Sequence, residues 1–265
     1  MLHDLGVSGR NLFASVFSDE PVPDVEAAIV VAHPGEESLS ASWVMVRLQD
    51  RASVYCLTKA VGGCGGGTVA AAALAGVPPE RSNNLGLSED EFARDLEALV
   101  WLTTAAVSAL QPRVLITHAC EGTNLDHDAT AFAVHMTARL MTRSGAGAPV
   151  VVELPSLPRG ATEPGREPLV LAAKPAVKIE FGPESRKVKR RMLRCHRELD
   201  AVADSGSLES EAYILATSCN PLDNLATASG PYRDAAWCHV EDFRRHARDV
   251  AASLSFAVLS TPSRA

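Results

Sequence analysis

Residues 27–38 read AAIVVAHPGEES, and this stretch decides the fold. It opens with an apolar run, which predicts a buried β-strand, and it continues into His33, Pro34 and two carboxylates, Glu36 and Glu37. Proline fixes its own φ and favours an extended conformation for the residue before it, so the backbone at His33 is stiff. In open α/β sheets, ligands lie beyond the carboxyl ends of the strands, which is where this sequence places a histidine and two acids.

A second strand end offers a matching group. Residues 113–118, RVLITH, are again apolar and predict a buried strand, and Asp126 and His127 follow at the start of a helix predicted over residues 130–139. Two strand ends thus supply His33, Glu36 and His127. A His/carboxylate/His set with open positions is the usual composition of a catalytic zinc site, so these three residues are the candidate metal ligands.

The two stretches resemble the paired motifs of the LmbE-like (PIG-L) N-deacetylase family, which read AHPDDE and GGHPDH. Here they stand as AHPGEE at 32–37 and GTNLDH at 122–127, and the flanking THACEG (117–122) and DATAFAV (128–134) are similar to a bacterial branch of the family. The resemblance covers residues 25–200. It implies a Rossmann-like three-layer α/β/α sandwich with a mostly parallel sheet, a Zn²⁺ ion, and removal of an N-acetyl or N-acyl group from an amino sugar or similar small molecule.

The same resemblance shows where the chain departs from the family pattern. The family's general base, the first Asp after His-Pro, corresponds to Gly35, and the metal-binding Asp corresponds to Glu36. The His that assists catalysis corresponds to Asn124, whereas the last His is kept as His127. The family's Arg and Glu in the helix after the second strand have no counterpart in residues 65–72, GGGTVAAA. The alternative to an active hydrolase is therefore a catalytically degenerate relative that binds a metal, a ligand or a partner protein.

With Gly35 at the base position, Glu36 and Glu37 are the carboxylates left to act as a base. Asp126 is expected beside a metal-bound histidine, which usually donates its second N–H to a carboxylate. We therefore predict catalytic roles for Glu36, Glu37 and Asp126. Structural alternatives remain: Glu36 suits a helix N-terminus, Glu37 suits a purely structural role, and His33 suits a buried, hydrogen-bonded imidazole.

Three further features have other interpretations. Residues 62–67, GGCGGG, precede a predicted helix and suggest a phosphate-binding loop, so a nucleotide-binding domain is a third hypothesis; however, the GxGxxG and P-loop spacings are missing, which favours an active-site rim. The basic run over residues 186–194 indicates a solvated helix face or a surface for an acidic substrate. His118 and Cys120 resemble a base and nucleophile without a third group. The remaining histidines are expected on helix or surface positions: His135, His196, His239 and His246.

The 265 residues, 46% of them hydrophobic, suffice for one large α/β domain. We expect an N-terminal extension (1–24), the LmbE-like domain (25–204) and a C-terminal extension (205–265) that packs on it. A net charge of −7 argues against nucleic-acid and membrane partners, which leaves a small-molecule substrate and an open oligomeric state. The six cysteines include no C-x-x-C pair, which favours free thiols in a reducing cytoplasm. We identify no signal peptide and no apolar run of about 18 residues.

Alternating helices and apolar strands indicate a parallel sheet. Beyond the two strands above, strands are predicted at 53–57, 82–87, 150–154 and 213–217. One or two more strands are predicted within residues 169–181. Helices are predicted at 38–49, 68–75, 88–110 with Ser88 as N-cap, 185–203 and 240–254, with a short amphipathic helix near residues 12–17.

Overall fold

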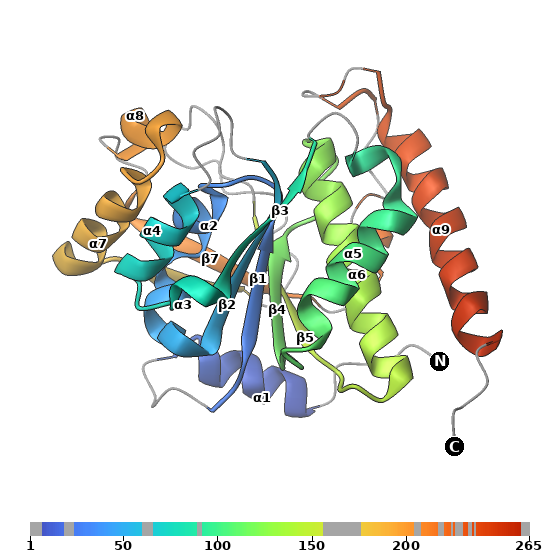
Figure 1. The fold of residues 1–265 in the computed structure, drawn as a ribbon, viewed down its shortest axis with the longest axis horizontal. Coiled ribbons are helices and arrows are strands. Elements are labelled where there is room, and N and C mark those ends of the chain that lie inside the picture. The colour runs from blue at the N-terminus through green and yellow to red at the C-terminus, as the bar shows by residue number, and fades with distance from the viewer. Residues whose placement is uncertain are drawn as a thin grey trace.

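The computed structural model describes residues 7–18, 24–59, 66–88, 92–155, 176–203, 208–216, 220–223, 225, 230–232, 235 and 237–260. Within these ranges the strands form one sheet in the order β3-β2-β1-β4-β5-β7-β6. Helices cover both faces of the sheet (Figure 1). The three-layer α/β/α sandwich predicted from the sequence is thus confirmed.

Five neighbouring strands of the sheet are parallel: β1 (Ala27–Val31), β2 (Ala52–Thr58), β3 (Ser82–Leu87), β4 (Val114–His118) and β5 (Val150–Leu154). The strand β7 (Ser210–Leu215) runs antiparallel to β5 and to β6 (Ala176–Glu180). β7 starts three residues before the predicted 213–217, because the buried Glu211 lies in a strand that apolar patterning alone cannot detect.

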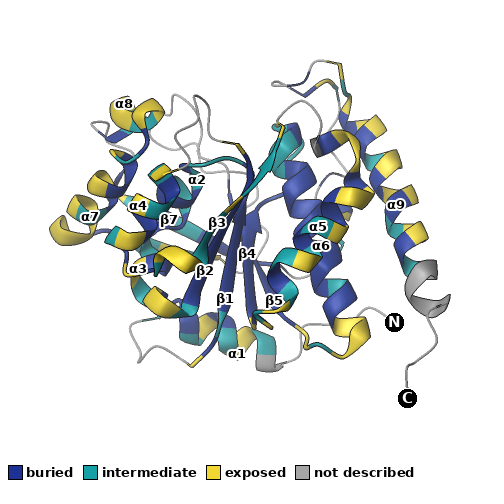
Figure 2. Cartoon of the chain, in the orientation of Figure 1, coloured by how far each residue is buried: buried dark blue, intermediate teal, exposed yellow. Residues whose placement is uncertain are grey.

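Alternate residues of β1 face opposite helix layers, as a pleated strand requires. Ala28 and Val30 belong to the core under α5 (Leu96–Ser108), α6 (Leu125–Ser144) and α9 (Val240–Ser260). Ala27, Ile29 and Val31 belong to the core under α1 (Val7–Val16), α3 (Ser42–Leu48), α4 (Gly66–Leu74) and α7 (Pro183–Leu193). Figure 2 shows the central strands buried throughout, which explains the unbroken apolar runs of the sequence.

Short helices complete the connections: α2 (Glu36–Ser40), α8 (Asp200–Ala203), and the single-turn helices η1 (Gln49–Arg51), η3 (Pro79–Arg81), η4 (Phe92–Arg94), η5 (Arg197–Leu199) and η7 (Pro221–Asp223). Among the described residues, no helix combines the length and apolar character needed to cross a membrane.

Helix boundaries were the weakest part of the sequence prediction. The segment 38–49 is two helices, because the Glu211 carboxylate accepts hydrogen bonds from the backbone N–H groups of Ser42 and Trp43 and so starts α3 separately from α2. The N-cap of α5 is Asp95, which accepts from the N–H of Ala98, so Ser88 as N-cap was wrong. The helix α6 begins at Leu125 rather than 130 and continues to Ser144.

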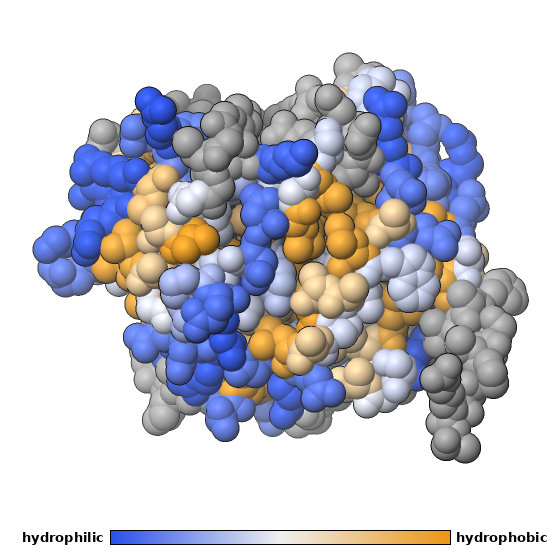
Figure 3. All heavy atoms as spheres, in the orientation of Figure 1, coloured by the Kyte–Doolittle hydropathy of each residue, from blue (hydrophilic) through white to orange (hydrophobic). Residues whose placement is uncertain are grey.

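The C-terminal half shows similar differences. The helix predicted over 185–203 is interrupted by an extended residue, His196, and divides into α7, η5 and α8. The cationic side chains of α7 at Arg186, Lys187, Arg190 and Arg191 are exposed, which supports the solvated-face interpretation, and Figure 3 shows hydrophilic residues gathered over this part of the surface. Residues 62–65 of the glycine-rich loop and most of the predicted strand region 169–181 lie outside the described residues.

Candidate metal centre

The strand order creates a switch point between β1 and β4. The chain goes from β1 to β2 and β3 on one side, then crosses to β4 on the other side of β1. Connections leave the two strands in opposite directions there, and in open α/β sheets ligands bind beyond the carboxyl ends of the strands at such a point. His33 follows β1, His118 ends β4, and His127 lies in the first turn of α6, so all three lie at this edge of the sheet.

A tight turn after β1 folds Glu36 back over His33. The N–H of His33 donates to Glu36 Oε2 (2.8 Å), and the N–H of Glu36 donates to the carbonyl of His33 (3.3 Å). Gly35 makes this turn with a φ of 100°, a left-handed conformation that costs a glycine little. A Cβ at Gly35 would lie 2.8 Å from Leu199 Cδ1. The turn therefore depends on having no side chain at this position.

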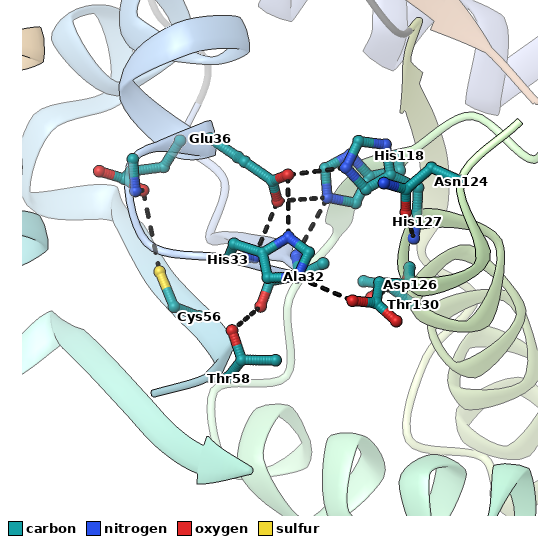
Figure 4. Close-up of polar contacts among 12 residues, drawn as sticks. Ala32, His33, Glu36, Cys56, Thr58, His118, Asn124, Asp126, His127 and Thr130 are labelled. Carbon is teal, nitrogen blue, oxygen red and sulfur yellow. Dashed lines mark hydrogen bonds and ion pairs between the residues drawn. The ribbon is translucent and has the colours of Figure 1, made fainter. Parts of the chain in front are cut away.

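Three imidazoles surround the carboxylate of Glu36 (Figure 4). Oε1 lies 3.1 Å from His33 Nδ1 and 2.7 Å from His127 Nε2, and Oε2 lies 3.1 Å from His118 Nε2. The rings of His118 and His127 are stacked, with centroids 3.9 Å apart. The sequence indicates only a pairing of His118 with Cys120, and the structure places His118 in this cluster instead. Glu36 also lies in the first turn of α2, a helix without a side-chain cap hydrogen bond at its N-cap.

Neighbouring groups hold the ring of His33 and the backbone of His127. Asp126 Oδ2 lies 2.8 Å from His33 Nε2, which leaves Nδ1 as the His33 nitrogen that faces Glu36. Asn124 is the N-cap of α6 and its side chain accepts from the N–H of His127 (2.8 Å). The position that the family resemblance assigns to an assisting histidine thus has a structural task here, the start of the helix that carries His127.

A further acid beside the cluster was missed by the sequence analysis. Asp128 is buried and accepts hydrogen bonds from the N–H groups of Glu121 and Gly122 (2.8 and 2.9 Å) and from the hydroxyl of Tyr232 (2.8 Å). Burial raises the pKa of Asp128 to about 6, although these hydrogen bonds act in the opposite direction. Asp128 ties the loop after β4 and the C-terminal segment to α6. Only its place beside His127 in the second motif could have indicated it.

Glu37 lies outside the imidazole cluster. It is completely buried and accepts from the N–H of Gly35 (2.7 Å) and the hydroxyl of Ser38 (2.8 Å), and its Oε1 lies 2.9 Å from His196 Nε2. His196 is buried too and lies between α7 and η5, so the expectation of a helix or surface position was wrong for it, whereas His135 is buried on the helix α6. Glu37 supports the turn that presents His33 and Glu36.

The cluster stabilises positive charge. Burial lowers the pKa of His33, but its contacts with Asp126 and Glu36 outweigh burial and raise that pKa to about 10. Burial raises the pKa of Glu36, but the nearby His118 and His127 hold it well below its usual range. Burial, followed by the charge of His127, lowers the pKa of His118 to about 4. A carboxylate that stabilises an imidazolium also stabilises a cation bound to the neutral imidazole.

The donor set fits a divalent metal. One ligand atom from each of His33, Glu36 and His127 lies within 4.8 Å of the others. Neutral imidazole nitrogens and a carboxylate are typical zinc ligands, and the second nitrogen of His33 has the carboxylate partner that metal-bound histidines usually have. His127 Nδ1, by contrast, is buried without a hydrogen-bond partner in the described part of the chain. Of the two candidate histidine ligands, His33 therefore has a hydrogen-bond partner for its second ring nitrogen, and His127 has none among the described residues.

No protein-family model matches the sequence, and a search of curated proteins finds no match. Solved structures do share its fold. The A40926 pseudoaglycone deacetylase Dbv21 superposes with a TM-score of 0.54 at 14% identity, over 73% of this chain and 97% of its own. The N,N′-diacetylchitobiose deacetylase of Pyrococcus horikoshii has a TM-score of 0.50 at 13% identity, over 82% and 94%. GalB, the 4-carboxy-2-hydroxymuconate hydratase of Pseudomonas putida KT2440, has 0.50 at 15%, over 68% and 82%.

These matches show the fold: the chain has the LmbE-like α/β fold that its two motifs predict. The same fold carries deacetylases and a hydratase, so the fold by itself does not determine the reaction.

Proposed function

We propose that this protein is a zinc-dependent amidohydrolase that removes an N-acyl group from an amino sugar or a similar small molecule. The observation that supports this most is the grouping of His33, Glu36 and His127 at the switch point of a fold shared with two deacetylases. We assign these residues as the zinc ligands. When bound, zinc polarises an acyl carbonyl and lowers the pKa of a bound water to about 7.

The remaining residues of the centre have supporting tasks in this proposal. Asp126 holds His33 through Nε2 and keeps Nδ1 directed at the centre. Glu37 and Asp128 hold the two loops that carry the ligands. The side chains of His33, Glu36 and His127 are 24, 18 and 18% exposed, so the centre is partly open to solvent.

We further propose that turnover is slow. Gly35 has no side chain to act as a base, and the Glu37 carboxylate is already engaged by Gly35, Ser38 and His196. A positioned general base typically contributes about 10²- to 10⁴-fold to the rate. The Asp126 carboxylate is engaged by His33 Nε2, and Glu36 has to serve as a ligand.

A second candidate function is a catalytically degenerate relative that binds a metal or a ligand. The conformation of Gly35 favours this alternative. Its φ of 100° and the 2.8 Å separation between a Cβ there and Leu199 Cδ1 leave little room for a carboxylate at this position. The loss of a base would then be built into the backbone of the turn.

The two candidates are separated by measuring acetate release from N-acetylglucosamine and N,N′-diacetylchitobiose alongside the zinc content of the same preparation. The matched variants are His127→Ala, which removes a proposed ligand, and His246→Ala, which removes an exposed histidine of α9. The hydrolase proposal expects zinc and slow release in the wild type and in His246→Ala, and neither in His127→Ala. Zinc binding without release supports the degenerate alternative, and release that persists in His127→Ala contradicts the proposed site.

A further inference from the structure

A buried histidine outside the imidazole cluster reaches the turn that carries two of the candidate ligands. His196 is an extended residue at the junction of α7 and η5, and it is 3% exposed. Its N–H donates to the carbonyl of Leu193 (3.0 Å), and its carbonyl accepts from the N–H of Leu199 (2.9 Å). The end of α7 and the start of η5 therefore hold the backbone of His196 on both sides.

The ring of His196 is a hydrogen-bond partner of Glu37. Its Nε2 lies 2.9 Å from Glu37 Oε1 and 3.3 Å from Ser38 Oγ. An ionised carboxylate can only accept, so the contact with Glu37 requires the proton on Nε2. Ser38 donates to the same carboxylate oxygen (2.8 Å), and the thiol of Cys56 donates to the other one over 3.8 Å. Because Glu37 is completely buried, its carboxylate needs these donors in place of water.

Glu37 connects His196 to the candidate ligands. Glu37 Oε2 accepts from the N–H of Gly35 (2.7 Å), and Gly35 is the residue at which the chain turns between His33 and Glu36. The same turn brings Glu36 Oε2 to 2.8 Å from the N of His33. Two buried hydrogen bonds, from His196 to Glu37 and from Gly35 to Glu37, thus join the end of α7 to the turn at the metal centre.

Two glycines leave the space that the ring of His196 occupies. The helices α2, α4 and α7 contact one another on one side of the sheet (Figure 1). A Cβ at Gly67, in the first turn of α4, would lie 2.8 Å from His196 Nδ1 and 2.9 Å from the carbonyl oxygen of Cys195. A Cβ at Gly35 would lie 3.4 Å from His196 Cγ. Among the described residues, a Cβ at Gly66 would meet no atom within 4 Å, so the close approach to His196 is specific to Gly67.

We propose that His196 is a positioning residue of the metal centre. Its contact with Glu37 sets the turn that presents His33 and Glu36 to one ion. This inference rests on the proposed function for the presence of the metal. It assigns part of the control over metal binding to the end of α7, which lies outside both sequence motifs. Groups that hold metal ligands in place without touching the metal typically change metal affinity by about 10- to 100-fold when they are removed.

The test is calorimetric titration of Zn²⁺ into the metal-stripped full chain. The visible absorption spectrum of the Co²⁺-loaded protein is a second readout, because it reports the arrangement of the ligands rather than stability. His196→Leu removes the donor to Glu37, so it should weaken zinc binding by about 10- to 100-fold and change the Co²⁺ spectrum. His196→Gln restores an N–H donor and should recover most of the affinity. His246→Ala, at an exposed histidine of α9, is the control and should bind zinc as the wild type does.

A second pair of variants tests the same contact and leaves His196 and Glu37 in the chain. Gly67→Ala should displace the ring of His196 and weaken zinc binding several-fold, although alanine favours a helix more than glycine does. Gly66→Ala is the matched control in the same helical turn and should leave zinc binding unchanged. Circular dichroism shows whether each variant is folded. If His196→Leu does not fold, the two glycine variants decide the question.

Folded His196→Leu and Gly67→Ala variants that bind zinc as the wild type does, with the same Co²⁺ spectrum, would overturn the inference. Reduced stability with unchanged zinc affinity would also overturn it, because His196 would then have a structural role alone. The two proposals fail separately. Weaker zinc binding in these variants, without acetate release by the wild type, supports the positioning role and contradicts the hydrolase. Acetate release by the wild type, with zinc affinity unaffected by His196→Leu, supports the hydrolase and contradicts the positioning role.

Discussion

Two glutamates, Glu36 and Glu211, each collect several polar groups, and they differ in what those groups are. Glu211 accepts from the ammonium of Lys189, the hydroxyl of Tyr213 and the N–H groups of Ser42 and Trp43. Each of these partners is a donor, so the Glu211 carboxylate is satisfied by the protein alone. The side chains of Lys189 and Glu211 are 1 and 2% exposed, so their ion pair is buried. A buried ion pair needs such additional hydrogen bonds to offset the loss of hydration.

The partners of Glu36 are imidazoles, whose ring nitrogens either donate or offer a lone pair. His118 Nε2 accepts from the N–H of Ala32 (3.0 Å), yet it also lies 3.1 Å from Glu36 Oε2. The contact between His118 and Glu36 is therefore not a fixed donor–acceptor pair, because the role of an imidazole nitrogen depends on its protonation state. The difference is that Glu211, which is surrounded by fixed donors, stabilises the core, whereas Glu36, which is surrounded by histidines beyond a strand end, forms a candidate binding site.

The largest effect is expected at the core glutamate. Glu211→Ala leaves Lys189 buried without its counter-charge, so the free energy of unfolding should fall by about 3–5 kcal/mol. Urea unfolding followed by circular dichroism measures this. Glu184→Ala, at an exposed side chain of α7, is the control and should stay within about 0.5 kcal/mol of the wild type. A loss below about 1 kcal/mol for Glu211→Ala would show that this cluster does not stabilise the core as described.

A smaller effect is expected at the turn that carries Glu36. Gly35→Ala places a side chain on a residue with a φ of 100°, which should cost about 1–2 kcal/mol of stability in the same urea assay. Leu199→Ala in the same chain separates backbone strain from the close contact with Leu199 Cδ1. If the double variant recovers the full loss, the contact and not the backbone conformation excludes side chains at this position.

The hydroxyl of Tyr232 joins the segment before α9 to Asp128 on α6. In Tyr232→Phe, Asp128 loses one of its buried donors, so the free energy of unfolding should fall by about 1–2 kcal/mol. Phe243, on α9, packs edge-on against the ring of Tyr232. The hydroxyl is absent in Tyr232→Phe but the ring contact remains, so an unchanged unfolding midpoint would assign the anchoring to the ring instead.

The smallest effect is expected at the cap of α6. Asn124→Ala removes the acceptor for the N–H of His127 and should cost about 1 kcal/mol, while Asn124→Asp should keep most of the stability. The comparison of the two variants in urea unfolding isolates the cap. Equal losses for Ala and Asp would exclude a capping role for this side chain.

The parallel core of the sheet and the grouping of the three candidate ligands could be predicted from the sequence because both depend on local patterns. Buried parallel strands are unbroken apolar runs, and the two short motifs after β1 and β4 contain His33, Glu36 and His127. The roles of His118, Asp128 and His196 could not be predicted, because each depends on a partner from another part of the fold: Glu36, Tyr232 and Glu37. The start of α3 at Ser42 could not be predicted for the same reason, because the N–H of Ser42 donates to Glu211, which is distant in the sequence.

The central claim is that the carboxylate of Glu36 and the imidazoles around it hold a divalent metal. The most direct test is elemental analysis of the purified full chain together with calorimetric titration of Zn²⁺ into the metal-stripped protein. We predict about one zinc per chain in the wild type and in His246→Ala, and loss of binding in both Glu36→Ala and His127→Ala, which should remain folded by circular dichroism. A wild type that binds no metal, or folded Glu36→Ala and His127→Ala variants that bind zinc as the wild type does, would contradict the claim.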